Sequence, residues 1–326
     1  MTTTLEAPPD RSEVAPAPAT RPKFPPKPPK PPRRLPRSML PLAPLTRTQM
    51  LIQSASAILA ALLIGFLVNL LVISHLQHAV SQQQQRHVFR EQLAAGTAPV
   101  SEGTFDDILL VDGAPVALLD IPSLGLHEVV GEGTSSGDLM LGPGHRRDTV
   151  LPGQAGVSVI MGRAGAYGGP FSRLQELAPG ERFSVVTGQG KQLFEVIGVR
   201  YAGDPAPPAP KAGESRLILE TARGPAYLPT GVARVDAELV GESQDAGARR
   251  TTFDTLPPQD KSLATDTRTA WALVFALQFF LLAEAGAVWT YRRIGAQKMW
   301  VVFVPILLLA GLIVGDQLNR FLPNLL

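Results

Sequence analysis

Residues 157–171, VSVIMGRAGAYGGPF, decide the fold of this chain. The run VSVIMG is short and apolar, which is typical of a buried strand, and the glycines after it indicate a loop that leads into a short helix, PFSRLQEL. A second run, RLILETA at residues 216–222, has the same strand character. We therefore expect two core strands, the first of which ends in a glycine-rich loop.

Residues 114–241, which contain both runs, are predicted to form one folded domain. Further short β-type runs, among them VALLDIP, RFSVVTG, QLFEVIGVRYAG and GVARVDAELV, are separated by turn signals such as Gly-Gln-Gly and Gly-Asp-Pro. Many short strands with little helix are typical of a closed barrel or a sandwich. A domain of about 125 residues can bury an adequate core without disulfide bonds.

Composition limits the chemistry that this chain can perform. The 326 residues contain no cysteine and five scattered histidines. Disulfide bonds, thiolate metal sites and a cysteine nucleophile are therefore excluded, and neither a zinc site nor any other metal or cofactor is expected. The net charge of +2 is too small to indicate nucleic acid as a partner.

Three stretches are apolar and long enough to cross a membrane: residues 50–73, residues 270–290, and most of residues 300–322. Basic residues lie before the first stretch, within residues 1–48, and after the second, in YRRIGAQK. Because Lys and Arg favour the cytoplasmic side, we expect a multi-pass membrane protein with a cytoplasmic N-terminus and an extracellular domain at 114–241.

The remaining segments are expected to be accessory. Residues 1–48 are rich in proline and basic residues, which predicts a disordered cytoplasmic tail that either only fixes membrane orientation or also docks a proline-binding module or anionic lipid. Residues 75–113 are expected to be a helical stalk and linker, and residues 242–268 a second linker. Glu284 lies within a predicted span, where it either faces a partner or stays neutral near the membrane surface.

The folded domain resembles sortases over about residues 114–241. The motifs that carry the resemblance are IPSLGLHEVVGEGT, GPGHRRDTVLPGQAGVSVIMG, AYGGPF, LAPGERFSV and RLILETA. The resemblance is closest to the actinobacterial class E type. It implies an eight-stranded β-barrel on the outer face of a Gram-positive membrane, and a sorting-signal peptide or a surface protein as the partner.

The resemblance also implies that the catalytic site is degenerate. The sortase Cys and His align with Ala222 and Arg163, and the sortase Arg falls at about Val232. Alanine offers no nucleophile, and a guanidinium does not release a proton near pH 7. Arg234 is either a shifted equivalent of the family's Arg or a surface strand residue. The resemblance therefore implies a pseudo-sortase.

Six residues are candidates for lining the degenerate groove: Arg163, Tyr167, Glu220, Thr221, Arg223 and Arg234. Strand alternation puts Glu220 on the same face as Ala222, so Arg163 and Glu220 either form an ion pair across the groove or both point to solvent. Three functions stay open at this point. They are an inactive sortase-like protein that binds a peptide or surface protein, a peptidase or transpeptidase with a nucleophile other than cysteine, and a structural subunit of a membrane complex.

Overall fold

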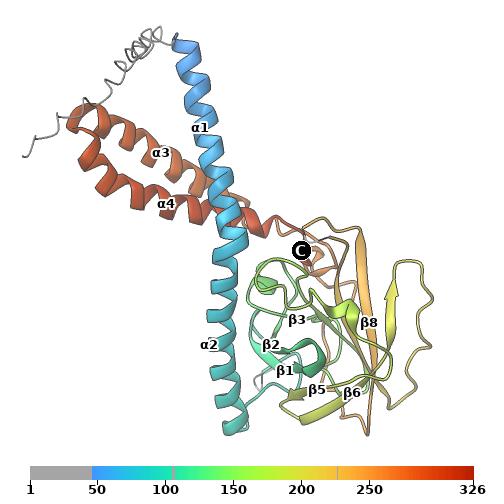
Figure 1. Ribbon diagram of the computed structural model, residues 1–326. Coiled ribbons are helices and arrows are strands. Elements are labelled where there is room, and N and C mark those ends of the chain that lie inside the picture. Colours follow the sequence, from blue (N-terminus) through green and yellow to red (C-terminus); the bar gives the residue numbers. More distant parts are fainter. Residues whose placement is uncertain (1–45, 105, 107, 226) are drawn as a thin grey trace, which may run out of the picture. The chain divides into compact units, whose positions relative to one another are not determined.

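Eight strands close into a barrel in the order β1-β2-β3-β4-β7-β8-β6-β5 (Figure 1). The computed structural model describes residues 46–104, 106, 108–225 and 227–326, so the predicted tail over residues 1–48 lies almost entirely outside the described residues. The prediction of an eight-stranded barrel is confirmed. The strands are β1 (Pro115–Ile121), β2 (Leu126–Glu132), β3 (Gly144–His145), β4 (Gly156–Met161), β5 (Arg182–Thr187), β6 (Gly190–Tyr201), β7 (Ser215–Arg223) and β8 (Gly231–Leu239).

The two runs that decided the fold lie side by side as β4 and β7, in parallel register from Gly156↔Ser215 to Met161↔Glu220. Parallel strands are covered on both faces, which agrees with the burial of Ser158–Met161 and with the apolar residues that dominate VSVIM. β7 also pairs with β8, antiparallel, and this register sets Ala222 opposite Val232. The ends of β4, β7 and the start of β8 therefore meet at one place on the barrel.

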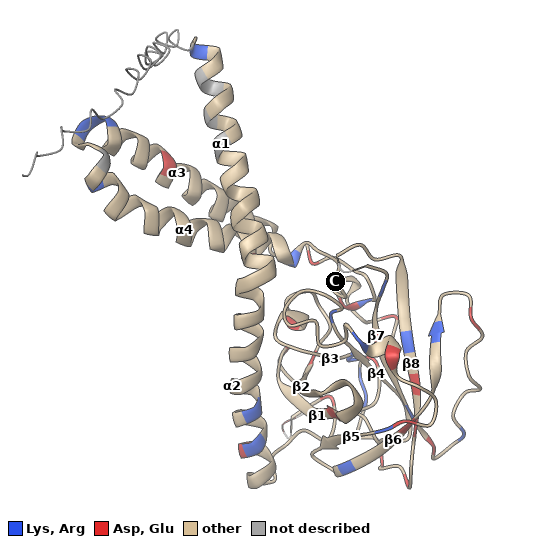
Figure 2. Ribbon diagram, in the orientation of Figure 1, with Lys and Arg blue, Asp and Glu red and all other residues tan. Residues whose placement is uncertain are grey.

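Within the residues that the structure describes, three helices are long and apolar enough to cross a membrane, by length and composition, as predicted. The first is one continuous rod of α1 (Arg47–Val68), a π-helical turn (Asn69–Ile73) and α2 (Ser74–Ala95). The others are α3 (Ala270–Ile294) and α4 (Ala296–Arg320). Figure 2 shows basic residues gathered at the turn between α3 and α4, in agreement with Arg292 and Arg293 in the last turn of α3.

The expected stalk packs against the barrel through α2. Gln82 accepts a hydrogen bond from Val129 N (2.8 Å) and donates to Val129 O (3.1 Å) and Leu141 O (3.0 Å). A buried amide that uses both its oxygen and its nitrogen in this way fixes the helix against the edge of β2. The helix that continues the first apolar span is thus part of the barrel's packing.

Both expected linkers also lie against the barrel. Gln154 donates to Val100 O (2.8 Å), and the buried Glu102 carboxylate accepts from Thr251 N (3.2 Å), so residues from the two linkers are joined. Farther along, Thr134 donates to Asp260 O (2.7 Å). Residues 258–264 therefore form a strap, a term we keep for this segment, that is pinned beside the end of β4.

Candidate functional site

Arg163 follows β4 and is the largest fully buried side chain of the barrel, with none of its surface exposed. Its guanidinium donates to Ser136 O (2.8 Å), Ser136 Oγ (2.9 Å) and the main-chain oxygen of Leu326 (3.0 Å). Burial lowers the pKa of Arg163 to about 10, so the group is still charged at neutral pH. This buried cation is committed to main-chain and hydroxyl oxygens, and it cannot serve as a general acid or base.

Tyr167 lies next to Arg163, with the guanidinium carbon 5.1 Å from the centre of its ring. The residue has a left-handed backbone (φ 52°), a conformation that is uncommon for a side chain of this size and that persists only where the surroundings enforce it. Asn319 of α4 donates to its hydroxyl (2.9 Å) and to Asn69 Oδ1 (2.7 Å). Tyr167 therefore joins the glycine-rich loop to two of the apolar helices.

Ala222 and Val232, the other two positions that we expected to be degenerate, belong to a small apolar cluster. They face each other across β7 and β8 and pack in this cluster with Leu325, which has no exposed surface. The cluster also contains Leu139 and Met161. The space beside Ala222 is therefore filled by a leucine from far along the chain.

Residues 321–326, which we call the resident segment, run through this site. Ala164 N donates to Leu325 O (2.9 Å), so the segment continues the hydrogen bonding of the chain just past β4. Asn324 is fully buried and donates through its amide nitrogen to Thr134 O (2.8 Å) and to Lys261 O of the strap (3.0 Å). The site that the sequence resemblance indicated is therefore filled by a segment of the same chain.

The hypothesis of an Arg163–Glu220 pair is wrong. The register of β7 and β8 places Arg234 directly opposite Glu220, and Arg234 donates to the Glu220 carboxylate (3.0 Å). Ser262 of the strap donates to the same oxygen of Glu220. Arg163 lies beyond the end of β4, where strand alternation no longer fixes the direction of a side chain, and it turns to Ser136 instead.

Thr221 and Arg223 do not join the other candidates. Thr221 is fully buried and donates to Gly162 O (2.9 Å), so its hydroxyl holds β7 to the end of β4. Arg223 is exposed, and its guanidinium stacks on Tyr201 with 4.2 Å between the guanidinium carbon and the ring centre. The structure thus brings Arg163, Tyr167, Ala222 and Val232 around the resident segment and leaves Thr221 and Arg223 apart from it.

A buried Thr149–His145–Glu132 arrangement has the outline of a catalytic triad. His145 Nδ1 is 2.8 Å from Glu132 Oε2, and Nε2 is 3.2 Å from Thr149 Oγ1. However, Nε2 is also 2.9 Å from Val150 O, and because a carbonyl only accepts, this nitrogen carries a hydrogen. Thr149 in turn donates to the carbonyl of Arg146 (2.7 Å), so the imidazole is not placed to take the hydroxyl proton.

The predictions left out two features of the site, of which only one has a signal in the sequence. The resident segment carries no local signal that relates it to β4, because the contact joins residues far apart in the chain. The Glu220–Arg234 pair, by contrast, was accessible, since opposite charges on two β-type runs that pair antiparallel are a recognisable signal. No group of three or more metal-ligating side chains is found in the described part of the chain.

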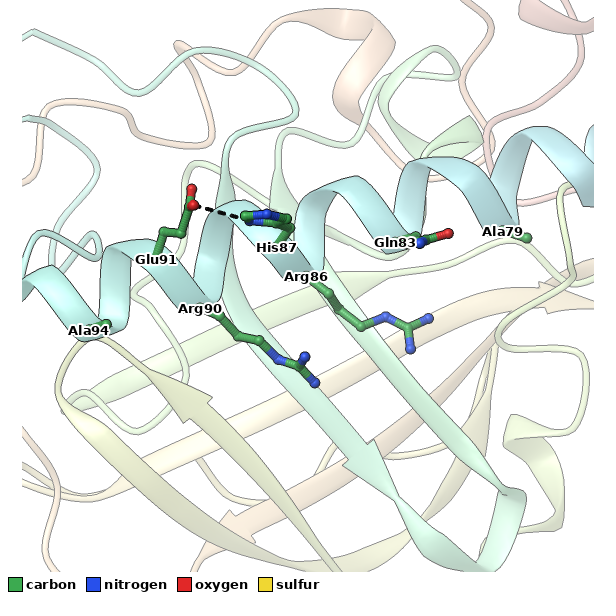
Figure 3. A pocket seen from close by; sticks show the side chains of 7 residues that line it. All are labelled: Ala79, Gln83, Arg86, His87, Arg90, Glu91 and Ala94. Carbon is green, nitrogen blue, oxygen red and sulfur yellow. Dashed lines mark ion pairs between the residues drawn. The ribbon is translucent and has the colours of Figure 1, made fainter.

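A hollow of about 750 Å³ runs along α2 and away from this site (Figure 3). It is lined by residues of that one helix, including Arg86, Arg90 and an exposed His87–Glu91 pair at 3.3 Å. Arg86 and Arg90 project on one side of the helix (Figure 3). Exposed pairs of this kind contribute little to stability, and none of the site candidates lies here.

Comparison with known proteins places the likeness in the barrel. Residues 119–228 match the family model of the sortase domain. Among solved structures, the chain is similar to a Clostridium perfringens Sortase D5 transpeptidase (20% identity, TM-score 0.42, 50% of this chain and 99% of that one). It is similar as well to C. perfringens sortase C with the C-terminal cell wall sorting motif (18% identity, TM-score 0.38, 49% of this chain and 88% of that one). A third similar structure is Sortase E1 from Streptomyces coelicolor with a tripeptide in the active site (23% identity, TM-score 0.34, 40% of this chain and 91% of that one). No curated protein matches the chain.

Proposed function

We propose that this protein is a membrane-anchored, sortase-like protein that performs no cysteine acyl transfer and instead binds a peptide segment at its degenerate site. The observation that carries the proposal is the pair of replacements at that site: Ala222 is an inert wall beside Leu325, and Arg163 holds the main-chain oxygen of Leu326. These are the properties of a binding site, because an acyl transfer would need a thiolate and a proton carrier there.

The cellular setting of this function is part of the proposal. Three apolar helices and the basic turn between α3 and α4 support a multi-pass protein whose barrel faces the outside of the cell. The sortase-like barrel and the class E resemblance support a role at the surface of a Gram-positive, actinobacterial-type cell. The partner we propose is a surface protein or a sorting-signal peptide.

An acyl-transfer assay tests the proposal. The full chain in detergent is incubated with a fluorogenic sorting-signal peptide, alone and with triglycine as the acceptor. We expect no turnover by the wild type or by Ala222→Cys, because Arg163 cannot exchange a proton with the new thiol. Turnover by the wild type or by Ala222→Cys alone would overturn the proposal.

One observation favours a structural subunit of a membrane complex as a second candidate function. A cavity of about 550 Å³ is bordered by apolar side chains of three helices and by the partly buried carboxyl of Glu284. An acid among apolar helices is costly unless a donor approaches it. If this function holds, Glu284→Leu shifts the protein from a larger detergent-solubilised assembly to a smaller one, whereas Leu282→Ala, on an exposed position of α3, does not.

A further inference from the structure

We infer that the degenerate site selects a peptide with Asn-Leu at its centre, of which the resident segment is one example, and that it accepts such a segment from a partner when the resident segment is withdrawn. The inference rests on the proposed peptide-binding function and adds the class of ligand. It follows from the contacts of three consecutive residues of the resident segment and from the way the segment is tethered.

Asn324 is selected by carbonyl groups. Its amide nitrogen donates to Thr134 O and Lys261 O, and its backbone N–H donates to Ala264 O (2.9 Å). Two carbonyls aimed at one fully buried side chain require a donor with two hydrogens, which Asn supplies. An Asp carboxylate would meet both carbonyl oxygens without a hydrogen, and an apolar side chain would leave them unpaired.

Leu325 is selected by shape. Its side chain is fully buried among Leu139, Met161 and Ala222, and the small Ala222 is one wall of the space it fills. A peptide with a polar residue here would bury that group without a partner. A residue larger than leucine would overpack the cluster. The Leu specificity thus comes from the same alanine that removes the sortase nucleophile.

Main-chain contacts set the register of the peptide. Ala164 N donates to Leu325 O, and Arg163 donates to the next main-chain oxygen, that of Leu326. Any peptide offers these oxygens, so they fix where the chain lies without choosing its sequence. Pro323–Leu326 form a turn closed by the hydrogen bond from Leu326 N to Pro323 O (3.1 Å), with Asn324 and Leu325 at its centre. Register from the main chain and selection from the Asn and Leu side chains together describe a site for a peptide that turns at Asn-Leu.

The resident segment is held as a tethered competitor. It continues directly from α4, where Asn319 is bonded to Tyr167 and Asn69, and Ser136 Oγ donates to Leu322 O (3.2 Å). Because a free peptide can bind only while the tethered segment is out of the site, its apparent affinity is the intrinsic affinity multiplied by the fraction of molecules in which the site is open. A partner that shifts α4 would therefore expose the site.

The test uses the absence of cysteine from the chain. The full chain is prepared with Ala164→Cys and Leu325→Cys. The hydrogen bond between the main chains of these two residues keeps them within disulfide range. Leu325→Cys also weakens the packing of the resident segment in the site. A labelled peptide FLPNLL is titrated into the oxidised and the reduced forms. We expect the reduced form to bind at least about tenfold more tightly, since oxidation locks the competitor in place. The pair Leu228→Cys and Leu325→Cys, in which residue 228 is exposed, is the matched control and should bind equally in both redox states.

A second variant and two altered peptides test the selectivity. Asn324→Ala loosens the resident segment without changing the barrel side of the site, so it should bind FLPNLL more tightly than the wild type does. FLPDLL and FLPNSL should each bind at least about tenfold more weakly than FLPNLL to this variant. Equal binding of all three peptides would overturn the Asn-Leu selectivity.

Two further outcomes separate this inference from the proposed function. Equal binding to the oxidised and reduced forms of Ala164→Cys/Leu325→Cys would place the peptide elsewhere and overturn the inference. A second outcome is that the Ala164→Cys/Leu325→Cys disulfide forms completely, while FLPNLL binds neither to the reduced form of this variant nor to Asn324→Ala. This outcome would show that the resident segment is a permanent part of the fold. That result also overturns the inference, while the acyl-transfer assay still decides separately whether the protein is non-catalytic.

Discussion

Replacing Arg163 with methionine should release the resident segment while leaving the barrel folded. The fully buried guanidinium donates to Ser136 O, Ser136 Oγ and the main-chain oxygen of Leu326, at 2.8, 2.9 and 3.0 Å. In Arg163→Met, two carbonyls lose their donor, at about 1–3 kcal/mol each. Removing a charge that was costly to bury offsets part of this loss. We expect a local loss of about 3 kcal/mol, or roughly a hundredfold in the opening equilibrium of the site.

Hydrogen exchange measured by mass spectrometry on the full chain in detergent checks this value. Exchange should rise roughly a hundredfold in peptides that cover the resident segment and Ala164, and should stay unchanged in β1 and β5, which lie elsewhere in the barrel. Arg163→Lys is the matched control, because it keeps the charge and part of the hydrogen bonding and should give a smaller increase. Unchanged exchange in the resident segment of Arg163→Met would refute the reasoning that this cation holds the segment in place.

The remaining predictions concern pH, topology and the junction with α4. Burial, then repulsion from Asp138, raises the pKa of Asp260 to about 7, and burial raises that of Asp138 to about 6. Between about pH 4 and 7 the folded protein therefore keeps protons that the unfolded chain has released, so the free energy of unfolding falls as pH rises through this window. Asp260→Asn should make the free energy of unfolding depend less on pH and should raise Tm at pH 8. A Tm that increases with pH would contradict this. Protease added to cells without a wall should digest residues 105–268 and spare residues 1–48, and protection of residues 105–268 would contradict the outward topology. Asn319→Leu should increase protease cleavage of the resident segment, because the Tyr167 hydroxyl and Asn69 Oδ1 lose the amide that donates to them. Cleavage at the wild-type rate would show that this junction does not hold the segment.

The barrel was predictable because its signals are local. Short apolar runs and the turns between them follow from strand alternation and from glycine and proline chemistry, and β4 could be recognised as a core strand from VSVIM alone. The three apolar helices likewise follow from length and composition. Each of these inferences needs only residues that are neighbours in the sequence.

The contents of the site were not predictable in the same way. The main-chain bond between Ala164 and Leu325 joins two parts of the chain that no periodicity relates. The direction of Arg163 depends on a loop beyond β4, where period-two alternation no longer applies, so the expected pair with Glu220 was wrong. The packing of α2 on Val129 through Gln82 was missed because a polar helix with many glutamines gives no sign of a contact surface.

The most direct test of the peptide-filled site is disulfide formation between Ala164→Cys and Leu325→Cys in native membranes. The chain has no other cysteine, so a mass shift in the peptide that joins the two positions reports this contact alone. If the resident segment occupies the site, the disulfide forms rapidly and nearly completely with a mild oxidant, while the Leu228→Cys and Leu325→Cys pair stays reduced. If the first pair stays reduced as well, and both thiols react freely with maleimide, the segment does not lie in the degenerate site and the account is contradicted.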